Sequence, residues 1–161
     1  MTQEDKQLLL NALCGYLLYG LKSTVVKFDD NDGSEYYTDC EILGIRRNQL
    51  VEFIRLQDSK EIGRSEWYDI SWFKPYLRPM SSMTEEEQKV FSDIESEFLE
   101  TLVKKVQQIK DDNERRHLLQ KAVAKRTSEM VQFYNKSHFD YNGLIEKGLA
   151  LEAPEGMYKI D

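Results

Sequence analysis

The sequence predicts an α+β protein in which an N-terminal helix and a small antiparallel sheet precede a long antiparallel helical hairpin. Apolar residues recur at strand-like intervals before residue 74 and at helical intervals after residue 84. Between these regions, Pro75 and Pro79 cannot both lie inside one helix or one central strand. We therefore expect two segments, 1–83 with the sheet and 84–161 with the hairpin and a short docked tail helix.

The first helix is expected to begin after Thr2 and to run to about residue 17. Thr2 with Asp5 three residues later has the spacing of a capping box, and Gly20 ends the segment. The expected inward stripe, with Cys14 beside it, consists of Leu9, Leu10, Leu13 and Leu17.

Three strands are expected at 23–29, 36–45 and 50–56, and a short fourth strand at 66–70. The connections are short, with turns at 29–33 and 46–49 and a polar loop at 58–65 that contains Gly63. Antiparallel strands with such links predict a small curled sheet, in the form of a partly open barrel, with the first helix on one face or edge.

The hairpin is expected to begin at Thr84, which forms a capping box with Glu87. Its first helix runs to about residue 110, residues 111–113 break it, and a second helix covers 114–134. The first helix has an apolar stripe of helical spacing: Phe91, Ile94, Phe98, Leu102, Val106 and Ile109. The short break predicts that the two helices lie antiparallel.

Charge supports this pairing. Residues 84–103 hold seven acids and one base, whereas residues 104–126 hold eight bases and three acids. Folding at 111–113 should bring one set of charges alongside the other, namely Lys121, Lys125 and Arg126 beside Glu95, Glu97 and Glu100. Each exposed pair contributes only ~0.2–1 kcal/mol, so the pattern indicates orientation more than stability.

The tail, residues 137–151, is apolar and is expected to pack back onto the body. A short helix is predicted around 144–147, with Gly148 as its cap.

Composition excludes several classes of function. The 161 residues carry a formal net charge of −7, and neither half is basic, so attraction to nucleic acid or to an anionic membrane surface is disfavoured. No apolar run has the length of a membrane span. The acidic N-terminus lacks the features of a signal peptide, which predicts a cytoplasmic location.

Residues capable of catalysis or metal binding are few. Cys14 and Cys40 are expected to be buried free thiols. His138 and Asp140 could begin a metal or acid–base site, but no Cys, His or Glu cluster completes it. Asp30, Asp32, Gly33 and Asp39 partly match a calcium loop, although strands flank them and Phe28 occupies the first ligand position; a plain turn is favoured. No cofactor and no metal is predicted.

Two segments could contact nucleic acid. Aromatic residues mix with Arg64, Lys74 and Arg78 in a cluster formed by Trp67, Tyr68, Trp72, Phe73 and Tyr76. Such mixtures bind single strands or pack a core, and the core is favoured, although this remains the best place to look for a binding surface. The basic helix at 114–126 could enter a major groove, but a solvated helix face is favoured.

Three stretches resemble a group of small uncharacterised proteins of Bacteroides-type gut bacteria and their phages and prophages. These stretches are the N-terminal residues 1–10, the joint KPYLRPMSSMTEE at 74–86, and the tail HFDYxGLIxKGLALxAP at 138–154. They cover about a quarter of the chain. Residues 91–134 are longer and more helical than in that group. The resemblance implies a cytosolic bacterial or phage accessory protein, and it implies no reaction.

These observations favour a non-enzymatic accessory protein that acts as a protein-interaction or regulatory module. A nucleic-acid-binding module is the alternative, and an enzyme ranks third. The unknown protein partner could be a second copy, bound through residues 84–134, because Val90, Leu99 and Val103 widen the apolar stripe beyond what one helix covers. The candidate interaction surface comprises Trp67, Trp72, Tyr76, Arg78, Leu99, Val103, Arg115 and Arg116.

Overall fold

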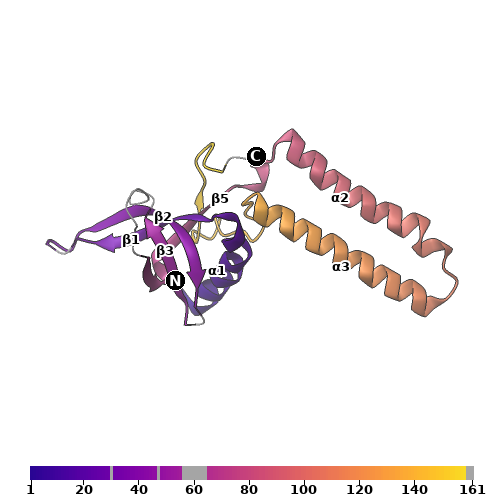
Figure 1. Cartoon of the computed structure of the whole chain (residues 1–161), viewed down its shortest axis with the longest axis horizontal. Coiled ribbons are helices and arrows are strands. Elements are labelled where there is room, and N and C mark those ends of the chain that lie inside the picture. Colours follow the sequence, from indigo (N-terminus) through magenta and orange to yellow (C-terminus); the bar gives the residue numbers. More distant parts are fainter. Residues whose placement is uncertain (30, 47, 56–64, 159–161) are drawn as a thin grey trace. The chain divides into compact units, whose positions relative to one another are not determined.

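The structure is a computed structural model that describes residues 1–29, 31–46, 48–55 and 65–158. Helices and a mixed sheet confirm the α+β class (Figure 1). The chain forms two compact units, Met1–Met80 together with Lys136–Asp161, and Ser81–Asn135. The tail therefore belongs to the unit that contains the sheet, whereas the sequence grouped it with the hairpin in 84–161.

Helix α1, Gln3–Tyr16, begins as predicted. The Thr2 hydroxyl accepts a hydrogen bond from the Asp5 amide, and the Asp5 carboxylate accepts one from the Thr2 amide. Its buried face is Leu9, Ala12, Leu13 and Tyr16, which confirms Leu9 and Leu13 of the predicted stripe. Leu10 and Leu17 of that stripe are partly buried against the same core. Cys14 is exposed rather than buried, because it lies one position away from this face.

Within the part of the chain that the structure describes, six strands form one sheet in the order β4-β3-β2-β1-β5-β6. The strands are β1 Lys22–Phe28, β2 Glu35–Ile45, β3 Leu50–Arg55, β4 Glu66–Asp69, β5 Phe73–Leu77 and β6 Leu151–Glu152. The first four were predicted, and they pair antiparallel. The predicted loop at 58–65 lies outside the described residues except for Ser65.

Strands β5 and β6 were not predicted. β5 pairs antiparallel with β1, and it also pairs with β6 in parallel, so the sheet is mixed rather than purely antiparallel. Pro75 is tolerated because β6 pairs only with Tyr76 and Leu77, so the strand has one partner at Pro75, namely Ser23 of β1. The stretch between the two predicted segments, which contains Pro75 and Pro79, is therefore partly a strand.

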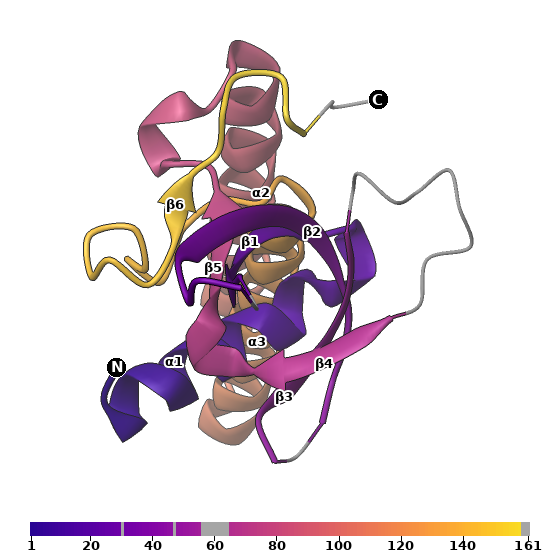
Figure 2. The ribbon, with the colours of Figure 1, turned by 90° about the vertical axis from the view of Figure 1, so that its left-hand side faces the viewer.

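The sheet is strongly curled (Figure 2), but it does not close into a barrel. A register shift between Ile42 and Gly44 in β2 adds local twist and bending. The concave face packs on α1 and on the tail, in a core that includes Leu9, Leu13, Tyr16, Val25, Phe53, Phe73 and Leu144.

The second unit is a hairpin of α2, Glu85–Lys104, and α3, Asp112–Lys136. Thr84 caps α2 as predicted, since its hydroxyl accepts from the Glu87 amide at 3.2 Å. Helix α2 ends at Lys104 rather than near residue 110, and a 3₁₀ turn at Val106–Gln108 follows it.

The tail holds no helix in its described residues. Residues 141–150 form consecutive turns, in which the Leu144 carbonyl accepts from the amides of Leu149 and Ala150. The predicted helix at 144–147 is therefore wrong. Asp140 directs this compact path, because its two carboxylate oxygens accept from the amides of Leu144 and Ile145 at 2.8 and 2.7 Å.

Candidate functional site

The first candidate site is a hollow of about 420 Å³ in the sheet unit. It lies where the end of β1 approaches β4 and the 3₁₀ turn Ile70–Trp72, which is a consequence of the curl of the sheet. We call it the aromatic pocket, and its lining is Lys27, Phe28, Trp67, Tyr68, Asp69 and Trp72. Both tryptophans of the chain belong to this lining.

The rings of the aromatic pocket are set at steep angles to one another. Phe28 meets Trp72 edge to face, with centroids 5.2 Å apart and planes at 82°. Tyr68 lies 6.1 Å from Trp72 with the planes at 57°. Phe28 remains 45 % exposed. The rings therefore meet edge to face or at a tilt and do not form a flat stack.

Lys27 is the buried cation of the aromatic pocket. Its ammonium donates to both carboxylate oxygens of Glu66, at 2.9 and 2.8 Å, and lies 5.4 Å from the Tyr68 ring centroid. Only 8 % of the residue is exposed. The carboxylate of Glu66 therefore neutralises the charge of Lys27, and the ammonium is a poor site for an anionic ligand.

Asp69 is the carboxylate of the aromatic pocket. Its Oδ1 atom accepts from the Lys6 ammonium at 2.8 Å and from the amide and hydroxyl of Ser71 at 2.9 and 2.6 Å. Partial burial raises the pKa of Asp69, but these hydrogen bonds outweigh it and lower the pKa to about 2. The carboxylate is therefore charged at neutral pH.

The structure divides the predicted aromatic cluster. Trp67 and Trp72 line the aromatic pocket, whereas Phe73 is fully buried in the core. Tyr76 donates to Asp39 Oδ1 at 2.9 Å, and the guanidinium of Arg78 lies 4.5 Å from the Phe139 ring centroid. Neither residue belongs to the pocket lining, and Arg64 lies outside the described residues.

Lys27, Phe28 and Asp69 were not predicted as site residues. Side chains alternate between the two faces of a strand, so Lys27 lies on the same face as the core residue Val25. A lysine on the face of a strand that packs in the core is unusual. That signal was available in the sequence. The approach of β1 to β4, however, depends on the three-dimensional curl of the sheet.

The second candidate site lies on the hairpin. Two ion pairs join the helices, Lys125 with Glu97 and Arg126 with Glu95, as the charge pattern predicted. Glu100 pairs instead with Lys104 on its own helix, at 2.6 Å. On an α-helix, Glu95 and Glu97 are about 200° apart, so the two pairs lie on opposite flanks of the helix–helix contact.

Apolar residues gather on the Glu95–Arg126 flank. Leu99 and Leu102 follow Glu95 by four and seven residues, and Leu119 and Val123 precede Arg126 by seven and three. We call these four residues the apolar strip. Leu99 is 56 % exposed and Val123 is 44 % exposed. Val103, also exposed, lies at the outer margin of this strip.

The opposite flank is mixed in character. A groove of about 340 Å³ lies between the helices and includes Glu97 and Lys125 of this flank together with Arg126 of the first. Its lining mixes charged and apolar side chains: Ile94, Glu97, Phe98, Thr101, Lys105, Leu118, Lys121, Ala122, Lys125, Arg126 and Glu129. The lining carries four basic and two acidic groups close together. We therefore interpret it as a set of solvated surface ion pairs and not as a binding site for an anion or a cation.

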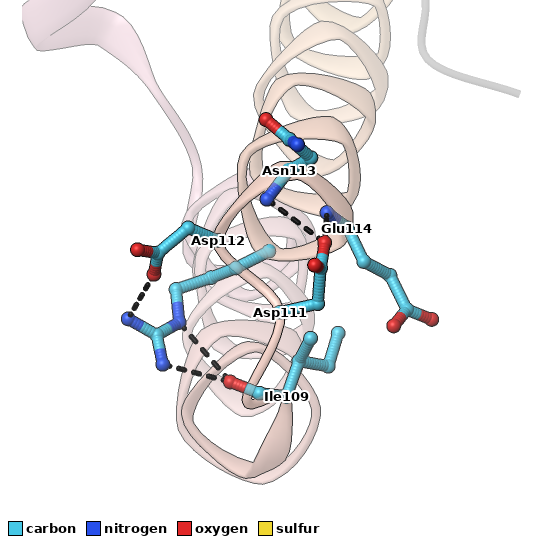
Figure 3. Close-up of polar contacts among 6 residues, drawn as sticks. Ile109, Asp111, Asp112, Asn113 and Glu114 are labelled. Atoms are coloured by element: carbon cyan, nitrogen blue, oxygen red, sulfur yellow. Dashed lines mark hydrogen bonds and ion pairs between the residues drawn. The ribbon is translucent and has the colours of Figure 1, made fainter.

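The two arginines of the predicted surface differ. Arg115 donates from its guanidinium to the Ile109 carbonyl, at 3.2 and 2.7 Å, and pairs with Asp112 at 3.3 Å (Figure 3). Asp111 accepts from the amides of Asn113 and Glu114 in the same turn. Arg115 therefore closes the hairpin turn. Arg116 is exposed and lies seven residues before Val123, on the flank of the apolar strip.

His138 and Asp140 do not form an acid–base pair. Both oxygens of Asp140 accept backbone amides, and the buried His138 ring stacks on Tyr158. Burial lowers the pKa of His138 to about 4, so the imidazole is neutral at pH 7. Cys40 is buried as predicted, and burial raises the pKa of its thiol to about 12.

The acidic turn after β1 is organised by its own backbone. The Asp29 carboxylate accepts from the Asn31 amide and the Asp32 carboxylate from the Ser34 amide, each at 2.8 Å. Asp30 lies outside the described residues. Within the described part of the chain, no three His, Cys, Asp or Glu side chains gather closely enough to hold a metal ion.

Comparison of the chain with protein-family models, with curated proteins and with solved structures finds no match. Among the described residues, none of the helices combines the length and the apolar character needed to cross a bilayer.

Proposed function

We propose that this chain is a non-enzymatic protein-interaction module of the bacterial cytoplasm, and that its hairpin binds a second copy of the chain. The supporting observation is the apolar strip, whose members Leu99, Leu119 and Val123 stay exposed on a hairpin that already pairs its inner faces. Large apolar side chains grouped on one helix face are typical of a surface that a partner covers.

Charge selects a second copy as the partner. Residues 84–103 carry a net charge of −6, from one base and seven acids, and residues 104–126 carry +5, from eight bases and three acids. In a dimer with twofold symmetry, α2 of one copy can lie against α3 of the other. Opposite charges then flank the apolar strips, and the closest like-charge contacts are avoided.

Nucleic-acid binding ranks below this proposal. Arg115, Lys125 and Arg126 are each engaged with acceptors of the hairpin itself. A phosphate backbone would have to displace these contacts and approach an acidic protein.

The dimer is tested by multi-angle light scattering at tens of micromolar protein. Leu99→Lys and Val123→Lys should each shift a 38 kDa species, twice the chain mass of 19.0 kDa, towards the monomer. The matched control is Val90→Lys. Val90 is also exposed on α2, but it lies seven residues before Glu97 and so on the opposite flank. A monomer of the unaltered chain, or equal effects of all three changes, would contradict the proposal.

A further inference from the structure

The geometry of the aromatic pocket points to a second binding activity, the capture of a guanidinium group such as the side chain of an arginine in a partner peptide. The lining combines four aromatic side chains with one carboxylate, that of Asp69. Aromatic π faces and carboxylate oxygens both attract cations, and a planar guanidinium can stack on the first while donating to the second.

The hydrogen-bond inventory of the lining favours a cationic donor. Among the described residues, the hydrogen bonds given to Asp69 come from Lys6 and Ser71 and end on Oδ1, so Oδ2 has acceptor capacity left towards this part of the chain. The Lys27 ammonium, in contrast, already donates to both oxygens of Glu66. A ligand that supplies N–H groups would therefore find an acceptor at this site, whereas a phosphate would find its nearest cation already paired.

The chain itself uses this chemistry on two rings of the pocket lining. The guanidinium carbon of Arg46 lies 3.9 Å from the centroid of the Trp67 ring, and the ammonium of Lys27 lies 5.4 Å from that of Tyr68. One face of Trp67 and one face of Tyr68 are therefore already covered by a cation of the chain itself. Among the described residues, no cation lies over the rings of Phe28 and Trp72, which are set at 82° to each other and extend the aromatic wall.

The volume agrees with such a ligand. A hollow of about 420 Å³ falls within the range of small-ligand pockets, and it is large enough for a guanidinium with part of its aliphatic stem. Apolar stem atoms can pack on Phe28 and Trp72 while the charged end meets Asp69.

The test uses the full chain labelled with ¹⁵N. Because Trp67 and Trp72 are the two tryptophans of the sequence, the two indole N–H signals in a heteronuclear NMR spectrum both report on this pocket. The probes are N-acetyl-arginine methylamide and N-acetyl-citrulline methylamide. Citrulline keeps the length and planarity of arginine but has no charge. We expect saturable shifts with the arginine probe at millimolar concentration and binding about tenfold weaker with citrulline.

Two substitutions should act in opposite directions. Asp69→Asn keeps the shape of the side chain and should weaken arginine binding about tenfold. Lys6→Gln removes the ammonium that now neutralises Asp69, and it should tighten binding about threefold. Asp39→Asn, which changes the same net charge at an exposed position outside the pocket, is the matched control and should leave binding unchanged.

Three results would overturn the inference. The first is the absence of any indole shift with arginine. The second is equal binding of arginine and citrulline, which would mean that the pocket recognises the planar shape of the side chain and not its charge. The third is tighter binding of tetramethylammonium than of arginine, which would assign the pocket to quaternary ammonium ligands. If Asp69→Asn does not fold, the probe pair and Lys6→Gln still decide the matter.

Discussion

The imidazole of His138 stacks on the phenol ring of Tyr158, with 3.6 Å between the ring centroids and 7° between the planes. The Tyr158 hydroxyl donates to the Tyr76 carbonyl at 2.8 Å and accepts from the Lys22 amide at 3.1 Å. His138 is 4 % exposed. A residue close to the end of the chain therefore covers a buried titratable group and ties it to two strands.

The first prediction is that the sheet unit loses stability in mild acid. Burial lowers the pKa of His138 to about 4 from 6.5, more than the backbone of Tyr19 raises it. Between these values the unfolded chain binds a proton that the folded chain does not, so stability is present above pH 6.5 and is lost as the pH falls towards 4. The loss is up to about 3 kcal/mol.

Urea unfolding at pH 7 and pH 5, followed by tryptophan fluorescence, measures this effect. His138→Phe keeps a flat ring against Tyr158 and should flatten the dependence on pH. His117→Gln alters an exposed histidine and should leave the pH dependence of the free energy of unfolding unchanged. If His138→Phe kept the full dependence, another group would have to be responsible.

The second prediction concerns the buried ammonium of Lys27. Glu66→Gln removes its counter-charge while keeping the size of the side chain. We expect a loss of ~1–3 kcal/mol in the free energy of unfolding, because a buried charge is left without its ionic partner. Glu100→Gln breaks the exposed pair with Lys104 and should cost less than about 0.5 kcal/mol. Equal costs for the two changes would show that Lys27 is solvated in solution.

The third prediction concerns the start of α2. Thr84→Ala removes the acceptor of the Glu87 amide and should cost ~0.5–2 kcal/mol. Thermal unfolding monitored by far-ultraviolet circular dichroism should register the change. Ser92→Ala, inside the same helix and exposed, should be neutral or slightly stabilising. A neutral Thr84→Ala would mean that the capping box does not form in solution.

The fourth prediction is that the chain binds DNA and RNA weakly or not at all at physiological salt. The net charge is −7, and the hairpin pairs Lys125 and Arg126 with its own acids. Fluorescence anisotropy with single-stranded and duplex oligonucleotides measures this directly. Submicromolar binding that weakens with salt would reverse the ranking of the two proposed functions.

Local signals in the sequence predicted much of the fold. Thr2 and Thr84 marked the helix starts because a capping box needs only residues three positions apart. The charge blocks predicted the pairing of α2 with α3, and the ion pairs of Arg126 and Lys125 confirm it. Strands β1 to β4 followed from short apolar runs and turn residues.

Features that depend on distant contacts could not be predicted in this way. Strand β5 was hidden by Pro75, which is compatible with a strand only because β6 leaves that position unpaired. Strand β6 exists through its parallel pairing with β5, from which it is separated by more than seventy residues. The aromatic pocket needs the curl that brings Lys27 to Glu66, and the sequence shows neither partner's position in space.

The parallel bridge between Arg78 and Phe139 joins two stretches of the sheet unit that the hairpin separates in the sequence. The Arg78 amide donates to the His138 carbonyl, and the Asp140 amide donates to the Arg78 carbonyl, both at 2.8 Å. During synthesis, a ribosome must therefore release the whole hairpin before the strands of the first unit meet their last partners. The hairpin is built from contacts that are local in sequence, so it can fold before the last strand of the sheet has been synthesised.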